Sequence, residues 1–181
     1  MTTFHDLGLG EKLLKAIEGC GYNEPTPIQA KAIPVIQMAR DVIGLAQTGT
    51  GKTASFILPM IDYLDGGRAR ARMPRTLVLE PTRELASQVA DNFDKYGKNH
   101  KLQKALLVGG ESVFEQTKLL ESGVDVLIAT PGRLIDLFER GSILLNDIKI
   151  LVIDEADRML DMGFIPDIEK IIKLLPATRQ T

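Results

Sequence analysis

The segment 46–53, which reads AQTGTGKT, restricts the possible folds of this chain more than any other. A short apolar run at 41–45 precedes it, and we expect this run to form a buried strand. The residues from Ala54 to Ile61 follow it and predict a helix. A glycine-rich turn that joins a strand to a helix and ends in Gly-Lys-Thr is typical of a phosphate-binding loop.

The residue types in this loop suit phosphate chemistry. Glycines allow backbone conformations that bring N–H groups close to phosphate oxygens. The lysine can reach the terminal phosphates, and the threonine hydroxyl can ligate Mg²⁺. The strict pattern begins with Gly where this chain has Ala, the smallest alternative. We interpret the whole segment as a nucleotide-binding loop rather than a structural turn; its residues are Ala46, Gln47, Thr48, Gly49, Thr50, Gly51, Lys52 and Thr53.

Apolar runs alternate with helical patterns along the rest of the chain. Besides 41–45, strands are predicted at 76–79, 104–108, 124–129 and 148–153. Helices are predicted at 11–18, 27–36, 112–120 and 166–175, and further helices open near residues 83 and 131. Pro34 should kink or break the second helix. This alternation predicts one α/β domain, a parallel sheet with helices on both faces.

Polar motifs follow the predicted strands, and the carboxyl ends of parallel strands meet at one edge of a sheet. Asp154 follows the last strand and is suited to hold Mg²⁺. Glu155 is the natural candidate to position and deprotonate an attacking water. The alternative is that this acidic cluster only caps the helix after it.

The other strand ends leave two interpretations open. Their backbone N–H groups, hydroxyls and arginines could bind phosphate oxygens, or they could simply form caps and tight turns. The residues concerned are Thr82, Arg83, Gly109, Gly110, Thr130, Gly132 and Arg133. Residues 65–75 hold four arginines and are interpreted as an exposed, mobile basic loop.

Gln29 also has two interpretations. Thr26 can cap a helix that has Pro27 in its first position, and Gln29 then stands where a capping-box residue reaches back. The spacing alone favours this capping role.

The composition excludes some classes of protein. The net charge of −2 argues against a general polyanion binder, so any nucleic-acid contact must be local. The single Cys20 excludes an internal disulfide and fits a reducing compartment. The first residues lack the pattern of a signal peptide, and no segment reaches the roughly 18 apolar residues of a membrane span. We expect a cytoplasmic protein.

Taken together and in this order, the motifs resemble those of the DEAD-box RNA helicases, and the resemblance covers nearly the whole chain. Residues 154–157 spell the family's name, and 46–53 resemble its phosphate loop, where Ala is usual in the first position. Phe4 and the segment 21–29 resemble its adenine-recognition motif. The resemblance implies a RecA-like P-loop NTPase domain that uses ATP and Mg²⁺.

The resemblance also implies roles for single residues. Gln29 would read adenine, Tyr22 would pack against the base and Phe4 would support that packing, so the preference for a capping role is reversed. Asp157 would link the site to a second domain. Single-stranded RNA would be held by its backbone, through Pro81, Thr82, Arg83, Gly109, Gly110, Thr130, Pro131, Gly132 and Arg133.

Family members have two RecA-like domains, and residues 1–181 resemble only the first. We expect the chain to be a fragment with weak nucleotide binding and little ATPase or unwinding activity of its own. Two rival functions are a phosphate-loop ATPase that acts on DNA or protein, and a non-catalytic RNA-binding or scaffold domain that uses nucleotide only to hold its shape. The intact Lys52, Asp154 and Glu155 speak against the scaffold.

Overall fold

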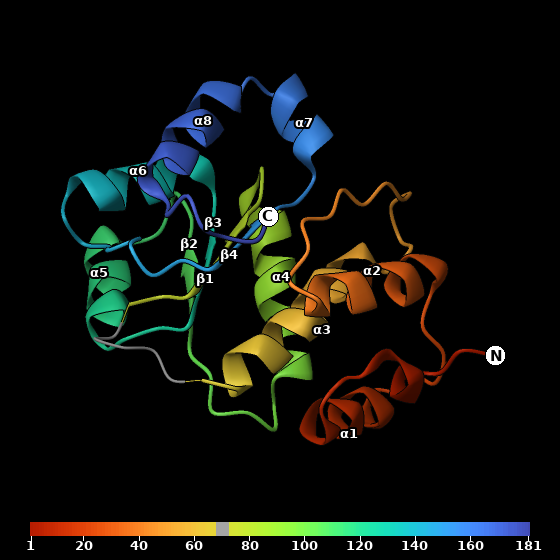
Figure 1. Ribbon diagram of the computed structural model, residues 1–181. Coiled ribbons are helices and arrows are strands. Elements are labelled where there is room, and N and C mark those ends of the chain that lie inside the picture. The colour runs from red at the N-terminus through yellow and green to blue at the C-terminus, as the bar shows by residue number, and fades with distance from the viewer. Residues whose placement is uncertain (68–72) are drawn as a thin grey trace. The chain divides into compact units, whose positions relative to one another are not determined.

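The computed structural model describes residues 1–67 and 73–181 (Figure 1). Three arginines of the expected basic loop, Arg68, Arg70 and Arg72, lie outside this part of the chain. The chain divides into two compact units, Met1–Arg68 with Asp91–Leu102 and Gln180–Thr181, and Ala69–Ala90 with Gln103–Arg179. In the part of the chain that the structure describes, no helix combines the length and the apolar character that crossing a membrane requires.

The first unit is helical. It contains the 3₁₀ helix η1 (Phe4–Leu7) and the helices α1 (Glu11–Gly19), α2 (Pro27–Gln37) and α3 (Lys52–Asp65). The predicted helices are confirmed, and α2 continues through Pro34 instead of ending there. Helix α2 packs against α3 and η1. The helix before the phosphate loop, α2, therefore lies beside the helix after the loop, α3.

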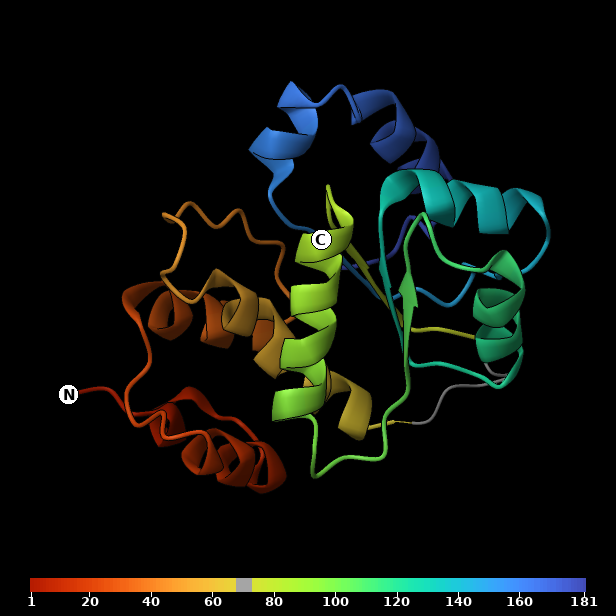
Figure 2. The ribbon, with the colours of Figure 1, turned by 180° about the vertical axis from the view of Figure 1, so that it is seen from behind.

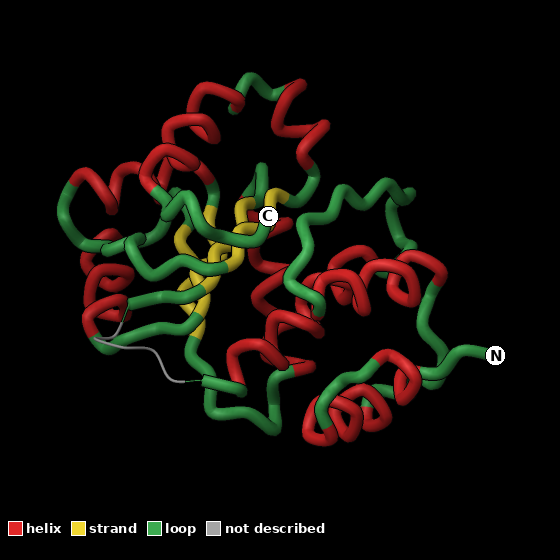
Figure 3. Tube along the Cα trace, viewed as in Figure 1, coloured by secondary structure: helices red, strands yellow, loops and turns green. Residues whose placement is uncertain are grey.

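The second unit is built on a sheet of four parallel strands, coloured yellow in Figure 3. The strands are β1 (Thr76–Leu79), β2 (Lys104–Leu107), β3 (Val126–Ala129) and β4 (Ile150–Ile153), in the order β2-β3-β1-β4. The helices are α5 (Val113–Glu121), α6 (Pro131–Glu139), α7 (Ala156–Asp161) and α8 (Ile165–Leu174). Helix α4 (Arg83–Tyr96) begins in this unit and ends in the first.

Alternate strand side chains form the core of the second unit. Leu77, Leu107 and Leu127 pack in one apolar cluster with residues of α5, α6 and α8. Helices α6 and α8 lie side by side, as two opposite views show (Figures 1 and 2). Val78 and Ile128, whose side chains point to the opposite face of the sheet, are also fully buried. The predicted parallel α/β fold is therefore confirmed.

The strand expected at 41–45 is wrong. The segment forms a loop, drawn green in Figure 3, and the side chains of Ile43 and Leu45 are 91% and 90% exposed. Its backbone is bonded elsewhere, because Val42 N donates to the carbonyl of Thr181. An apolar run predicts only a tendency to be covered, whereas a strand also needs a neighbouring strand to pair with. None of the four strands pairs with this segment.

Arg75 corrects the expected basic loop. Its side chain is buried, and its Nη2 lies 3.0 Å from Oδ1 of Asp125. The backbone of Arg75 joins the sheet margin, donating to the carbonyl of Asp125 and accepting from Lys149 N. The last arginine of the run is therefore part of the structure of the sheet rather than of an exposed loop.

Candidate functional site

The phosphate-loop segment has the backbone that its glycines predict. Gly49 and Gly51 have φ angles of 81° and 83°, in the left-handed region, and helix α3 begins at the next residue, Lys52. The Gly51 carbonyl accepts bonds from Ser55 N, at 3.3 Å, and from Ser55 Oγ, at 3.2 Å. Helix α3 thus starts with Lys52 and Thr53 in its first turn, where N–H groups and the helix dipole favour an anion.

Gln29 is bonded at both ends of its amide. Its Oε1 accepts from Thr26 N at 3.0 Å, which is the capping bond that the spacing predicts. Its Nε2 donates to the carbonyl of Gly51 at 3.2 Å, so the same side chain also supports the phosphate loop. A Cβ added to Gly51 would lie 2.3 Å from Nε2 of Gln29, and only glycine allows this close approach.

Phe4 and Tyr22 line one pocket of about 230 Å³, together with Thr3, His5, Leu14, Ile17, Glu18 and Asn23. Phe4 is buried, whereas Tyr22 is 44% exposed. The ring of Tyr22 lies 6.4 Å from that of Tyr96, and Lys95 Nζ lies 4.8 Å from the Tyr22 ring centroid. The two aromatic residues to which the family resemblance assigns a joint role therefore line the same pocket.

Lys95 and Tyr96 are neighbours of Tyr22 that the sequence did not indicate. Lys95 Nζ also donates to the Tyr22 hydroxyl at 3.3 Å, which fixes the exposed ring from one side. Burial raises the pKa of Tyr96 to about 12, and the nearby Tyr22 adds to the shift. Tyr96 is therefore neutral across the physiological range.

In the second unit, backbone bonds extend the sheet past its strand ends. Glu80 N donates to the carbonyl of Ala129, and Thr130 N donates to that of Leu107. Asp154 N donates to the carbonyl of Leu79 at 3.1 Å. These bonds hold the first polar residues after β1, β3 and β4 in register, so three of the predicted strand-end motifs share one edge, as expected.

Asp154 and Glu155 stand at a sharp turn between β4 and α7. Both side chains are half-buried, and Glu155 N donates to Oδ1 of Asp154 at 3.0 Å. Glu155 has φ 53° and ψ 44°, a left-handed conformation that is uncommon for a residue with a side chain. The turn lets two successive carboxylates avoid the opposite directions that a straight strand imposes. Asp157 lies in the first turn of α7 and is exposed.

The ends of β1 and β2 come together through Arg83. A Cβ added to Gly110 would lie 2.6 Å from Nη1 of Arg83, and Gly110 has a φ of 79°. Thr82 caps α4, since its Oγ1 accepts from Leu85 N at 3.3 Å. Pro81 is buried, and nothing lies within 4 Å of a Cβ built on Gly109. Arg83 and Gly110 therefore lie next to each other, and Pro81 and Thr82 directly precede Arg83 in the chain.

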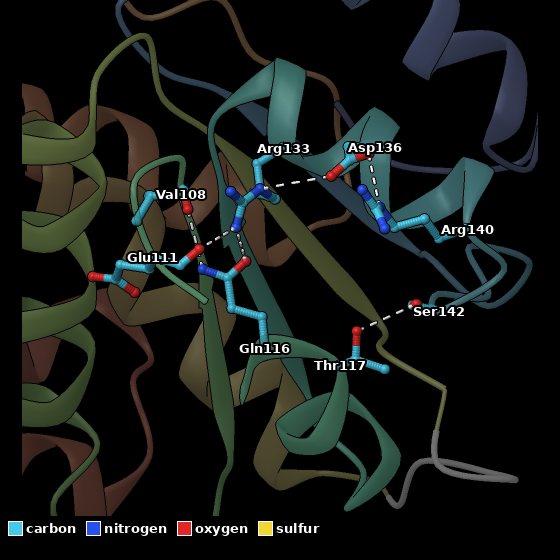
Figure 4. Close-up of polar contacts among 8 residues, drawn as sticks. All are labelled: Val108, Glu111, Gln116, Thr117, Arg133, Asp136, Arg140 and Ser142. Carbon is cyan, nitrogen blue, oxygen red and sulfur yellow. Dashed lines mark hydrogen bonds and ion pairs between the residues drawn. The ribbon is translucent and has the colours of Figure 1, made fainter. Parts of the chain in front are cut away.

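Arg133 links α6 to the turn after β2. Its Nη1 donates to the carbonyl of Glu111 at 3.1 Å and to Oε1 of Gln116 at 2.8 Å (Figure 4). Thr130 precedes α6, whose first residue is Pro131, and its hydroxyl makes no capping bond. Gly132 is exposed beside them. Sequence reasoning missed Gln116; the available signal was its place one turn before Leu120, on the same face of the predicted helix.

The oxygen atoms of Thr53 and Asp154 are suitable ligands for Mg²⁺, but too few to surround the ion. Thr53 offers a hydroxyl and Asp154 a carboxylate, and both are the oxygen ligands that Mg²⁺ prefers. Among residues 1–67 and 73–181, no group of three or more His, Cys, Asp or Glu side chains could hold a metal. Each of the two residues therefore fits as a single ligand of an ion that takes most of its other ligands from phosphate and water.

Comparison with known proteins agrees with these features. The family model described as DEAD/DEAH box helicase matches residues 26–181. A probable ATP-dependent RNA helicase ddx3 of Dictyostelium discoideum is 47% identical over 95% of this chain and 26% of its own length. A DEAD-box ATP-dependent RNA helicase CshA of Geobacillus kaustophilus is 45% identical over 100% of this chain and 38% of its own length.

A solved structure shows the same fold. The crystal structure of a DEAD box protein from the hyperthermophile Methanococcus jannaschii matches with a TM-score of 0.93 and 37% identity, over 99% of this chain and 48% of that one. The chain thus spans less than half the length of these relatives. With a family model that matches most of its residues and a loop, strand ends and acidic turn of the expected form, the chain belongs to the DEAD/DEAH box helicase family.

Proposed function

We propose that this chain is the first, ATP-binding RecA-like domain of an ATP-dependent RNA helicase. The whole protein couples ATP hydrolysis to the local unwinding or remodelling of RNA duplexes. The observation that carries this proposal is the left-handed backbone of Gly49 and Gly51 directly before α3 begins at Lys52. Similarity to longer proteins named as ATP-dependent RNA helicases supports it.

In this proposal, residues 46–53 hold the phosphates, with Lys52 on the terminal ones. Tyr22 packs against adenine, supported by Phe4, and Gln29 reads the edge of the base. The position of Gln29 supports a link between base and phosphate recognition, because its amide already contacts the phosphate loop through the Gly51 carbonyl. Such a side chain can report the nature of the base to the loop.

Hydrolysis needs a metal and an activated water. We assign the metal ligands to Thr53 and Asp154, and an Mg²⁺ ion held by them would neutralise charge on the phosphates. Asp154 is half-buried and its Oδ1 accepts from Glu155 N, which restricts the orientation of the carboxylate. Glu155 orients the attacking water and accepts its proton. Asp157, exposed at the start of α7, connects this site to the second domain.

The edge formed by the ends of β1, β2 and β3 binds the RNA backbone. Three side chains offer donors to phosphate oxygens. They are the guanidinium of Arg83 beside Gly110, the guanidinium of Arg133, and the hydroxyl of Thr130, which makes no capping bond. The exposed Gly132 permits close approach, and Pro131, Pro81, Thr82 and Gly109 shape the turns. Contacts of this kind read the backbone rather than the base sequence.

A second RecA-like domain completes the site by supplying arginine fingers, which are worth roughly 10³–10⁵ in rate in phosphoryl transfer. The partial coverage of the relatives supports this domain. The lone Cys20 of residues 1–181 fits a cytoplasmic location for this domain.

Nucleotide binding by residues 1–181 tests the first step of this proposal. Calorimetric titration with ATP and Mg²⁺ should show binding, and GTP should bind more weakly. Lys52→Ala should weaken ATP binding by about tenfold to hundredfold, because it removes a charged donor to phosphate. Lys31→Ala removes the same charge from an exposed position of α2 and serves as the control. Equal affinities of wild type and Lys52→Ala would contradict the assignment of the loop.

A further inference from the structure

Gln116 is a buried amide that joins two segments of the second unit. Its side chain is on α5, and the residue is 4% exposed. Its Nε2 donates to the carbonyl of Val108, just past β2, at 3.1 Å. Its Oε1 accepts from Nη1 of Arg133 on α6 at 2.8 Å (Figure 4). Both halves of the amide are therefore committed to fixed partners.

Arg133 is held from three directions. Besides Gln116, Nη1 binds the carbonyl of Glu111 at 3.1 Å, and Nε lies 3.9 Å from Oδ2 of Asp136. The Arg133 side chain is 13% exposed. No residue within the described ranges accepts a hydrogen bond from Nη2 of this guanidinium. The bonds to Nη1 and Nε thus fix the orientation of the Arg133 guanidinium, and its Nη2 group remains to bind a ligand.

Packing alone does not explain a glutamine at this position. Helix α5 buries Gln116 and Leu120 on one face, one turn apart. An apolar side chain of similar size would fill the same volume and would not need hydrogen-bond partners inside the protein. The role of the amide therefore lies in its two hydrogen bonds, which hold the Val108 carbonyl after β2 and the guanidinium of Arg133.

We propose that Gln116 is a positioning residue for RNA binding. It fixes Arg133 and the turn at 109–111 in one arrangement, so that the guanidinium and the turn backbone meet an RNA phosphate already ordered. Preorganisation of this kind raises affinity because less conformational freedom is lost on binding. This inference rests on the proposed function, which assigns the same edge of the sheet to RNA.

A double-mutant cycle on residues 1–181 tests it. The affinity for a fluorescently labelled single-stranded RNA is measured by anisotropy at low salt for wild type, Gln116→Met, Arg133→Met and the double variant. Each single change should weaken binding by about tenfold, the value of one charge-assisted bond. The double variant should stay within about twofold of Arg133→Met, since Gln116 acts through Arg133.

Two controls lie next to these residues. Thr117 lies on α5, next to Gln116, and Thr117→Val removes its hydrogen bond to Ser142 Oγ, at 3.4 Å. Arg140→Gln removes a charge from the end of α6 that pairs with the same Asp136, at 2.9 Å. Both are drawn in Figure 4, and each should change RNA affinity by less than about threefold. A loss as large as that of Gln116→Met would show a general effect and overturn the proposal.

The order of the Arg133 side chain gives a readout that does not depend on RNA. In NMR relaxation measurements on the RNA-free chain, the Arg133 Nε–H group should be rigid in wild type and mobile in Gln116→Met. Gln116→Glu should keep it rigid, because the carboxylate still accepts from Nη1. This second variant decides the question if Gln116→Met does not fold.

The outcomes separate this inference from the proposed function. If wild type binds no RNA, the assignment of this edge to RNA fails and the inference fails with it. If wild type binds RNA but Gln116→Met binds equally well, or if the two single losses multiply in the double variant, only the inference is overturned. A rigid Arg133 in Gln116→Met also overturns it.

Discussion

At the scale of single residues, Gln29 makes the capping bond that its spacing predicts and a second bond that spacing does not indicate. The local pattern Thr-Pro-x-Gln explains the bond to Thr26 N, three residues away. The bond to Gly51 joins residues 22 positions apart and depends on how α2 and α3 pack. Its role toward adenine stays a prediction, since neither bond tests it.

Gly109 and Gly110 give a matched pair of variants. Gly110→Ala places a Cβ 2.6 Å from Nη1 of Arg83 at a φ of 79°, whereas Gly109→Ala meets nothing within 4 Å. We expect Gly110→Ala to lower the free energy of unfolding by about 1 kcal/mol, because L-residues are strained at this φ. Gly109→Ala should change it by less than about 0.5 kcal/mol. Chemical denaturation measures both, and equal effects would contradict this account of the turn.

Tyr96 predicts the pH dependence of stability at alkaline pH. Burial raises its pKa from 10.0 to about 12 in the folded chain. Between these values the unfolded chain loses the proton first, so its contribution to stability is complete below pH 10 and is lost as the pH rises toward about 12. Tyr96→Phe should flatten this part of the stability curve, measured by thermal unfolding from pH 8 upward. An unchanged slope would exclude Tyr96 as its source.

At the scale of secondary-structure elements, the sequence predicted the main α-helices and four of the five expected strands, but not the 3₁₀ helix η1. The failure is instructive because 41–45 is mostly apolar, like the runs that do form strands, yet Ile43 and Leu45 are exposed. Pairing depends on a neighbour that periodicity cannot reveal. The buried ion pair of Arg75 with Asp125 could not be predicted for the same reason, because the partner lies far away in the sequence. A run of arginines considered by itself predicts a solvent-exposed loop.

Helix ends followed local rules more closely. Helices α1, α6 and α7 end in a Schellman motif with a left-handed glycine, at Gly21, Gly141 and Gly163. Helix α2 has the same pair of bonds, from Ala39 N to Ile36 O and from Arg40 N to Val35 O, but its left-handed residue is Ala39. A glycine at the expected position therefore indicates the motif in three helices, whereas the alanine at that position in α2 gives no such signal.

Ala39→Gly should therefore stabilise the chain. Ala39 has a φ of 57° and is exposed, so the change relieves strain without removing a buried contact. We expect the free energy of unfolding to rise by up to about 1 kcal/mol. Ala30→Gly, inside α2, should lower it by about 1 kcal/mol and serves as the opposite control. A destabilised Ala39→Gly variant in denaturant titrations would contradict the motif.

At the scale of the whole molecule, the order of motifs was more informative than any one of them. The phosphate loop alone indicates only a nucleoside triphosphatase, and the acidic turn alone could be a cap. Parallel topology explains why distant motifs share one sheet edge, and the backbone bonds after β1, β3 and β4 confirm that edge. Side-chain partners such as Gln116 and Arg133 could not be predicted from the sequence, because the two residues lie 17 positions apart and meet only in the folded chain.

The most direct test of the central claim is RNA-stimulated ATP hydrolysis by the two-domain protein that we propose. RNA should stimulate turnover far more than DNA of equal sequence, and residues 1–181 alone should show little turnover. Glu155→Gln should bind ATP with wild-type affinity and hydrolyse essentially none, because the water loses its base. Equal stimulation by DNA, or hydrolysis that persists in Glu155→Gln, would contradict the account.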